Sequence, residues 1–126
     1  MSTSMLQLLE ESKGDLVAFR ISGHIDKNDY DVMLPVLEEK IKQYGKINVY
    51  AEMQEVEDYS LKALWEELRF DFRHAADFKK AALVGEQQWL DWLTVAASPF
   101  TTAKVKRFTL EQRQQALDWI QTPEEA

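Results

Sequence analysis

Two strand-like segments open this chain, and helix and strand patterns then alternate to its C-terminus. The first segment runs from Met5 to Glu10 and the second from Leu16 to Ser22, with a short turn containing Gly14 between them. This spacing predicts a β-hairpin. A hairpin followed by strand–helix alternation predicts a mixed, mostly parallel sheet with right-handed crossovers.

Four segments have the apolar periodicity of amphipathic helices. The first has Asp26 as a candidate N-cap, an apolar stripe from Tyr30 to Tyr44 and Gly45 as its end. Pro35 lies inside it and predicts either a kink or an irregular first turn before that residue. The other helices are expected over Ser60–Asp77, over Glu86–Ser98 with Trp89, Trp92, Leu93 and Ala96 buried, and from a Thr109–Gln112 capping box onward with Ala116, Leu117 and Ile120 facing inward.

Three more strands are expected between these helices. They cover Lys46–Met53, Lys79–Val84 and Thr102–Phe108. The unbroken apolar run in the second of them predicts an interior strand, and the lysines of the third predict a protected sheet edge. The fold class is therefore α/β, a single domain over residues 1–126 with a five-stranded sheet, four helices and frayed ends at 1–4 and 122–126.

Charge and composition narrow the function. A net charge of −7 argues against nucleic acid and anionic membranes as partners, because both attract clustered Lys and Arg. The absence of cysteine excludes thiol nucleophiles and thiolate metal sites. With no signal peptide and no apolar run long enough to span a bilayer, we expect a cytoplasmic protein without a transmembrane segment.

Several motifs, taken with this element order, resemble the SpoIIAA-like family from about Met5 to Ile120. They are Ile21-Ser22-Gly23-His24-Ile25, Tyr30-Asp31 before Pro35, Ala63-Leu64-Trp65-Glu66, Asp77-Phe78-Lys79-Lys80-Ala81-Ala82-Leu83-Val84-Gly85, Trp89-Leu90-Asp91-Trp92 and Ser98-Pro99-Phe100. The fold is shared with STAS domains, which bind protein partners and can be switched by serine phosphorylation. It is also related to CRAL-TRIO domains, which hold lipids.

The resemblance implies two function classes. The first is a bacterial, non-enzymatic regulatory or protein-interaction module with a protein partner or a second copy as its ligand. The alternative is a carrier of an apolar small molecule or lipid in a pocket between helices and sheet.

Ser60 is the candidate phosphorylation site. By position, Asp58 and Ser60 resemble the Asp and the phosphorylated serine of the STAS motif, although Tyr59 and Leu61 replace its small residues. A phosphate at a helix N-terminus would be favoured by the helix dipole, but the acidic residues just upstream oppose it. The alternative is that Ser60 or Asp58 only caps the helix.

Phe70 is expected on the helix face opposite the apolar stripe. An exposed aromatic residue beside Arg and His suits a contact surface, because interfaces are enriched in aromatic residues and Arg. The alternatives are packing under a neighbouring loop and a single exposed Phe without a role, which is common on protein surfaces. The candidate partner contacts are Asp58, Tyr59, Ser60, Phe70, Arg73 and His74.

Large aromatic residues could instead line an apolar pocket, although core packing explains the same pattern. The candidate lining residues are Trp65, Phe72, Trp89, Trp92 and Phe100. The two histidines, His24 and His74, lack metal-ligand spacing, and we expect His24 to make a loop hydrogen bond. No glycine-rich phosphate loop or nucleophile elbow is present, so we expect no enzyme, cofactor or metal.

Overall fold

The computed structural model describes residues 5–56, 60, 62–63, 77–86, 89–97 and 103–122. Its strands are β1 (Met5–Leu8), β2 (Leu16–Gly23), β3 (Ile47–Val56), β4 (Phe78–Val84) and β5 (Lys104–Phe108). Its helices are α1 (Lys27–Tyr44), α3 (Trp89–Ala97), the short 3-10 turn η3 (Leu110–Gln112) and α4 (Arg113–Gln121). The predicted second helix falls almost wholly outside the described residues, within which Ser60, Lys62 and Ala63 are helical.

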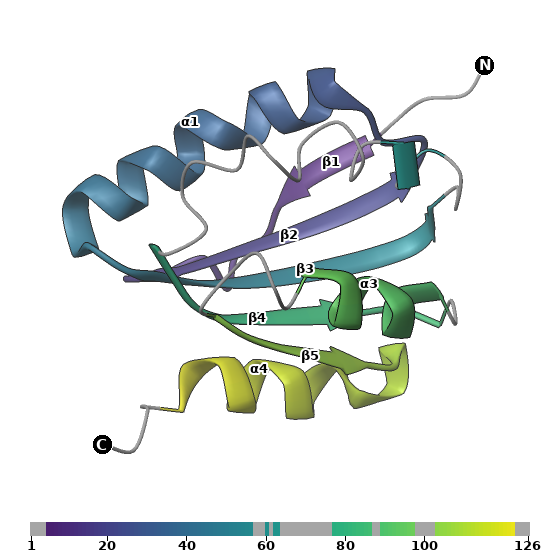
Figure 1. Cartoon of the computed structure of the whole chain (residues 1–126). Helices are drawn as coiled ribbons and strands as arrows, with labels where there is room; N and C mark the ends of the chain where they lie inside the picture. Colours follow the sequence, from purple (N-terminus) through teal and green to yellow (C-terminus); the bar gives the residue numbers. More distant parts are fainter. Residues whose placement is uncertain are drawn as a thin grey trace.

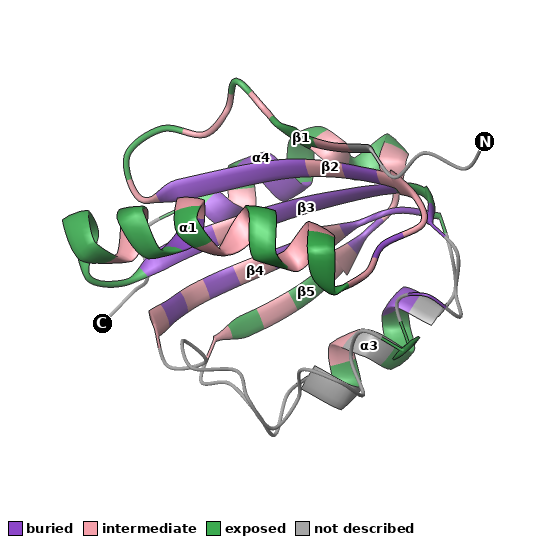
Figure 2. Ribbon diagram, turned by 90° about the horizontal axis from the view of Figure 1, so that it is seen from above, coloured by how far each residue is buried: buried purple, intermediate pink, exposed green. Residues whose placement is uncertain are grey.

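The strands form one sheet in the order β1-β2-β3-β4-β5, with β1 antiparallel to β2 and the other neighbours parallel. Each parallel strand thus lies beside the strand that precedes it in the sequence. Right-handed crossovers between strands added in one direction place the connecting helices on the same face. Figures 1 and 2 show the result: α1 and α3 cover one face of the sheet and α4 covers the other. The predicted mixed α/β fold is confirmed.

The ends of α1 follow from its sequence. Asp26 accepts hydrogen bonds from the backbone N–H groups of Asn28 and Asp29, and the Asp29 carboxylate accepts one from the Asp26 N–H. At the other end Gly45 has a φ of 83°, which favours glycine. The helix is continuous from Lys27 through Pro35, so of the two alternatives the irregular first turn is wrong, and a kink at Pro35 stays a prediction.

The core has two sides because the sheet has helices on both faces. Figure 2 shows β2 and β3 as the most continuously buried strands. On the α4 side, the strand residues pack with Ala116, Leu117 and Ile120, as predicted for that helix. On the opposite side, Leu37 of α1 and Leu90 of α3 pack against the alternate strand residues.

The two predicted roles of β4 and β5 are confirmed. β4 lies between β3 and β5, and β5 lies at an edge of the sheet. The capping-box prediction holds in part: the Thr109 N–H donates to the Gln112 side chain, but the segment begins as the 3-10 turn η3 before α4.

The burial predicted for Trp92 in the third helix is wrong, and the side chains of Trp89, Leu93 and Ala96 lie outside the described part of the chain. Trp92 is 43% exposed, whereas Leu90 is fully buried. The segment Trp89–Ala97 is apolar on most sides, so its periodicity does not single out one inward face. The inward position of Leu90 is set instead by a local contact, because its side chain packs against Gly85 at the end of β4.

Candidate functional site

A cluster of polar side chains lies on the α4 face of the sheet, centred on Glu52. Tyr50, Glu52 and Gln54 alternate along β3, so they share a face. β3 is the central strand, which buries Tyr50 completely and leaves Glu52 1% exposed. A carboxylate in such a place must be paired and hydrogen-bonded.

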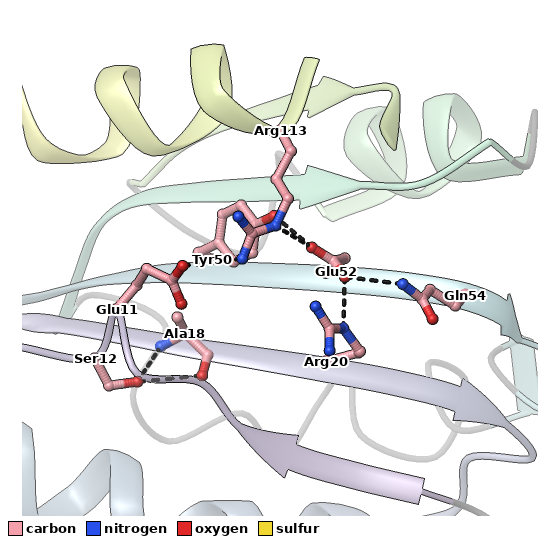
Figure 3. A network of polar contacts seen from close by, with 8 residues as sticks. All are labelled: Glu11, Ser12, Ala18, Arg20, Tyr50, Glu52, Gln54 and Arg113. Carbon is pink, nitrogen blue, oxygen red and sulfur yellow. Dashed lines mark hydrogen bonds and ion pairs between the residues drawn. The ribbon is translucent and has the colours of Figure 1, made fainter. Parts of the chain in front are cut away.

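Each carboxylate oxygen of Glu52 accepts hydrogen bonds from two donors (Figure 3). Oε2 accepts from Arg20 Nε at 2.6 Å and from Gln54 Nε2 at 3.0 Å. Oε1 accepts from the Tyr50 hydroxyl at 2.8 Å and from Arg113 Nε at 2.8 Å. The carboxylate is therefore fully satisfied, with two guanidinium groups to balance its charge.

Arg113 links this cluster to the loop between β1 and β2. Its Nη2 lies 3.0 Å from the Glu11 carboxylate. Next to Glu11, the Ser12 hydroxyl accepts from the Ala18 N–H and donates to the Ala18 carbonyl. With Glu11 and Glu52 against Arg20 and Arg113, the cluster is balanced in formal charge.

The pKa shifts agree with an ionised, paired Glu52. Burial alone would raise the pKa of Glu52, but the hydrogen bonds from Arg20, Tyr50 and Arg113 outweigh it and lower the pKa. Burial and the hydrogen bond to Glu52 raise the pKa of Tyr50, so its hydroxyl stays protonated as a donor. The pKa of Arg113 is raised, chiefly by its hydrogen bond to Glu52.

This arrangement fixes three elements to one another. Arg20 belongs to β2, Glu52 to β3, and Arg113 is the first residue of α4. Because the Glu52 carboxylate accepts all its hydrogen bonds from these partners, the geometry suits a structural role in which the cluster holds the three elements together. Within the described ranges, no group of three or more His, Cys, Asp or Glu side chains is arranged to hold a metal ion.

Sequence reasoning missed this cluster. Its signal was Tyr50, an aromatic residue on the otherwise polar side of the predicted third strand. An aromatic residue there indicates that the polar side is also buried. The polar residue two places on, Glu52, would then need cationic partners.

Ser60, the candidate phosphorylation site, is 4% exposed. Its hydroxyl accepts a hydrogen bond from the Ile25 N–H at 3.3 Å. A kinase would therefore need this region to open before it could reach the hydroxyl. Phosphorylation of Ser60 stays a prediction.

Trp92, predicted to line an apolar pocket, lies on the outer surface of α3. The ammonium group of Lys62 lies 5.8 Å from the centroid of its indole ring. Val95, one turn further along α3, is 74% exposed. The structure thus brings α3 and the start of the second helix together at this surface.

The other predicted site residues lie outside the described residues or side chains. They are Asp58, Tyr59, Trp65, Phe70, Phe72, Arg73, His74, Trp89 and Phe100. His24, expected to bond within its loop, has Nε2 3.3 Å from Asp26 Oδ2, which confirms that expectation.

A pocket of about 370 Å³ opens between the loop after β1 and the end of α4. It is lined by Glu11, Lys13, Asp15, Leu16, Asn48, Ile120 and Gln121. Most of these side chains are polar or charged, so this pocket does not suit an apolar ligand.

The model of the SpoIIAA-like family matches residues 16–121, which include every element from β2 to α4. The chain belongs to the SpoIIAA-like family. The family resemblance seen in the sequence motifs is thereby confirmed, together with the α/β fold.

One solved structure similar to this SpoIIAA-like chain is an uncharacterized protein from the DUF3478 family, with a SpoIIAA-like fold, from Shewanella loihica PV-4. The two are 24% identical with a TM-score of 0.68, and the match covers 95% of this chain and 97% of that one. At this identity the likeness shows the fold alone. No curated protein matches this chain. In the part of the chain that is described, no helix is both long and apolar enough to cross a membrane.

Proposed function

We propose that this SpoIIAA-like protein works by binding a protein partner rather than by catalysing a reaction. The contact surface in this proposal is the outward side of α3 together with the start of the second helix. In this proposal the protein is a bacterial regulatory module, as the family resemblance implies, and it acts in the cytoplasm. This extends the predicted contact surface, which comprised the loop from Glu55 to Ser60 and the exposed side of the second helix, to α3.

The observation that carries the proposal is the exposure of Trp92 and Val95. These residues lie three positions apart on α3, so their side chains are neighbours on the helix surface. Trp is one of the residue types enriched among those that dominate interface energies. A tryptophan that is 43% exposed is therefore a candidate anchor for a partner.

The charged groups around Trp92 supply the polar rim that such a surface needs. Lys62 lies over the indole ring, and Asp91 precedes Trp92 with 67% of its side chain exposed. Arg107 Nη1 lies 3.9 Å from the Asp91 carboxylate. Both signs of charge are thus present, which suits a protein partner of mixed charge.

The closed state of the Glu52 cluster also supports binding over catalysis. A catalytic carboxylate needs an open position for substrate or water. Glu52 instead accepts four hydrogen bonds from its own chain. Carriage of an apolar molecule is the second candidate function, and it becomes an outcome of the tests below.

Photo-crosslinking tests the proposed surface. Benzoyl-phenylalanine in place of Val95 should crosslink to one defined protein in the cells that make this chain. Adding Trp92→Ala should lower that yield roughly tenfold or more, as expected when an aromatic anchor is removed. The crosslinked protein is identified by peptide mass spectrometry.

Val32 is the matched control position, because it is a valine on α1 with 66% exposure. Benzoyl-phenylalanine there should give no defined adduct. The proposal fails if positions 95 and 32 give the same pattern, or if Trp92→Ala leaves the yield unchanged in a folded protein.

A further inference from the structure

In the described part of the chain, the sheet has two edges of opposite character. β5 carries Lys104, Lys106 and Arg107, which discourage another strand from pairing with it. β1, with the sequence Met5-Leu6-Gln7-Leu8, carries no charge. Natural sheets usually protect an edge strand, so an uncharged edge suggests a partner strand.

The backbone of β1 shows which groups face outward. The Leu9 N–H donates to the Ala18 carbonyl at 2.8 Å, which continues the β1–β2 ladder by one residue. In an antiparallel pair, successive residues alternate between facing the partner strand and facing away from it. Gln7 therefore bonds to β2, whereas Leu6 and Leu8 present their N–H and C=O groups outward.

The sequence around Gln7 is the same in both directions, because Leu6 and Leu8 flank it. An antiparallel strand of identical sequence, centred on Gln7, would place Leu6 opposite Leu8 of the second copy. Gln7 would lie opposite Gln7 of the second copy. No charges oppose one another in this register, and every outward N–H of Leu6 and Leu8 meets an outward carbonyl.

We infer that a second copy of this chain binds the β1 edge, β1 against β1, about a two-fold axis at Gln7. Such self-complementary contacts are the rule in two-fold dimers. Leu8 is 57% exposed on the face that α1 shares, and the second copy's Leu6 would cover it. This inference does not depend on the α3 surface, and the two can fail separately.

Charge at Gln7 tests the register in the full-length protein. Gln7 is exposed, so a charged side chain fits there in a single copy. Gln7→Lys sets two ammonium groups directly opposite each other, which should raise the dimer dissociation constant at least about tenfold. Mixing Gln7→Lys with Gln7→Glu should restore dimers, because the opposed pair is then Lys–Glu.

Sedimentation equilibrium over a range of concentrations measures the dissociation constant. Gln115→Lys, at an exposed glutamine on α4, is the matched control for the change in net charge and should leave dimerisation unchanged. Thermal unfolding confirms that each variant is folded. Restoration in the mixture excludes a folding defect as the cause of dissociation.

Amide hydrogen exchange gives a second readout at single residues. In the monomer the Leu6 and Leu8 amides should exchange quickly, and in the dimer they should be protected. The Gln7 and Leu9 amides should be protected in both. A protein that stays monomeric at every concentration overturns the inference. So does a dimer in which Leu6 and Leu8 still exchange quickly, or a Lys–Glu mixture that stays monomeric.

Discussion

Glu52 places a negative charge at the centre of the sheet. The free-energy cost of an unpaired charge there would exceed the whole free energy of unfolding of a typical domain. Its four donors come from its own strand, from β2 and from α4. The carboxylate is thus stabilised only when these elements are docked together. The free energy contributed by Glu52 therefore depends on correct packing on the α4 side of the sheet.

Glu52→Gln should lower the free energy of unfolding by about 3 kcal/mol. That is the low end for removing one partner of a buried ion pair. We expect the low end because the Arg20 and Arg113 side chains each remain 35% exposed, so water can solvate them. Urea unfolding measures the change. Glu39→Gln, at an exposed site on α1, should change stability by no more than about 0.5 kcal/mol.

Comparing Glu52→Gln with wild type also predicts a pH dependence. The pKa of Glu52 in the folded state is lowered from an ordinary value of 4.5. Its contribution is therefore complete above about pH 4.5 and is lost as the pH falls through the folded-state pKa. The difference in stability between wild type and Glu52→Gln should shrink with acidification below pH 4.5. A constant difference across that range would contradict an ionised Glu52.

The residue scale is where prediction from sequence was least complete. The buried pairing of Glu52 depends on Arg20 and Arg113, which are 32 and 61 positions away along the chain. Alternation along a strand indicates which residues share a face but not which distant side chains reach them. Ser60 shows the same limit, because its hydroxyl accepts a hydrogen bond from Ile25, 35 positions earlier.

Helices and strands with a clear stop signal were predicted well. Asp26 and Gly45 bound α1 as expected, because capping is a local property of the chain. β3 was predicted to end at Met53 but extends to Val56. A register shift lies near that end: Ser22 faces Gln54 and Gly23 faces Val56, which leaves Glu55 unopposed with a φ of 52°. Such a bulge depends on the neighbouring strand and leaves no local signal.

Gly85 tests the packing of α3 on the sheet. A Cβ there would lie 2.8 Å from Leu90 Cδ1 and 2.9 Å from the Met53 carbonyl oxygen. The leucine can shift but the strand carbonyl cannot, so Gly85→Ala should cost about 2 kcal/mol by overpacking. Urea unfolding measures the loss, and the Leu90 methyl resonances should move.

Gly14→Ala is the comparison for this variant. At Gly14 a Cβ would meet nothing within 4 Å, so only its positive φ of 57° opposes the substitution. The expected cost is about 1 kcal/mol, with unchanged Leu90 resonances. A Gly85→Ala protein as stable as wild type would contradict the close contact between α3 and β4.

The whole molecule has two sheet faces covered to different extents. Strands added in one direction send α1 and α3 to one face, and α4, with nine residues, is the α-helix on the other face in the described part of the chain (Figure 1). This asymmetry was predictable, because handed crossovers fix it once the element order is known. The surfaces were not predictable in the same way: the outward turn of Trp92 depends on how α3 rotates to bury Leu90.

We propose that this protein binds another protein, with carriage of an apolar small molecule as the second candidate function. Native and then denaturing mass spectrometry of protein purified from the cells that make it tests this most directly. We expect native masses of the bare chain, its dimer or a complex with a partner protein, and denatured masses of the separate proteins alone. An additional small apolar molecule, bound in the native spectrum and lost on denaturation, would contradict the claim and favour the carrier function.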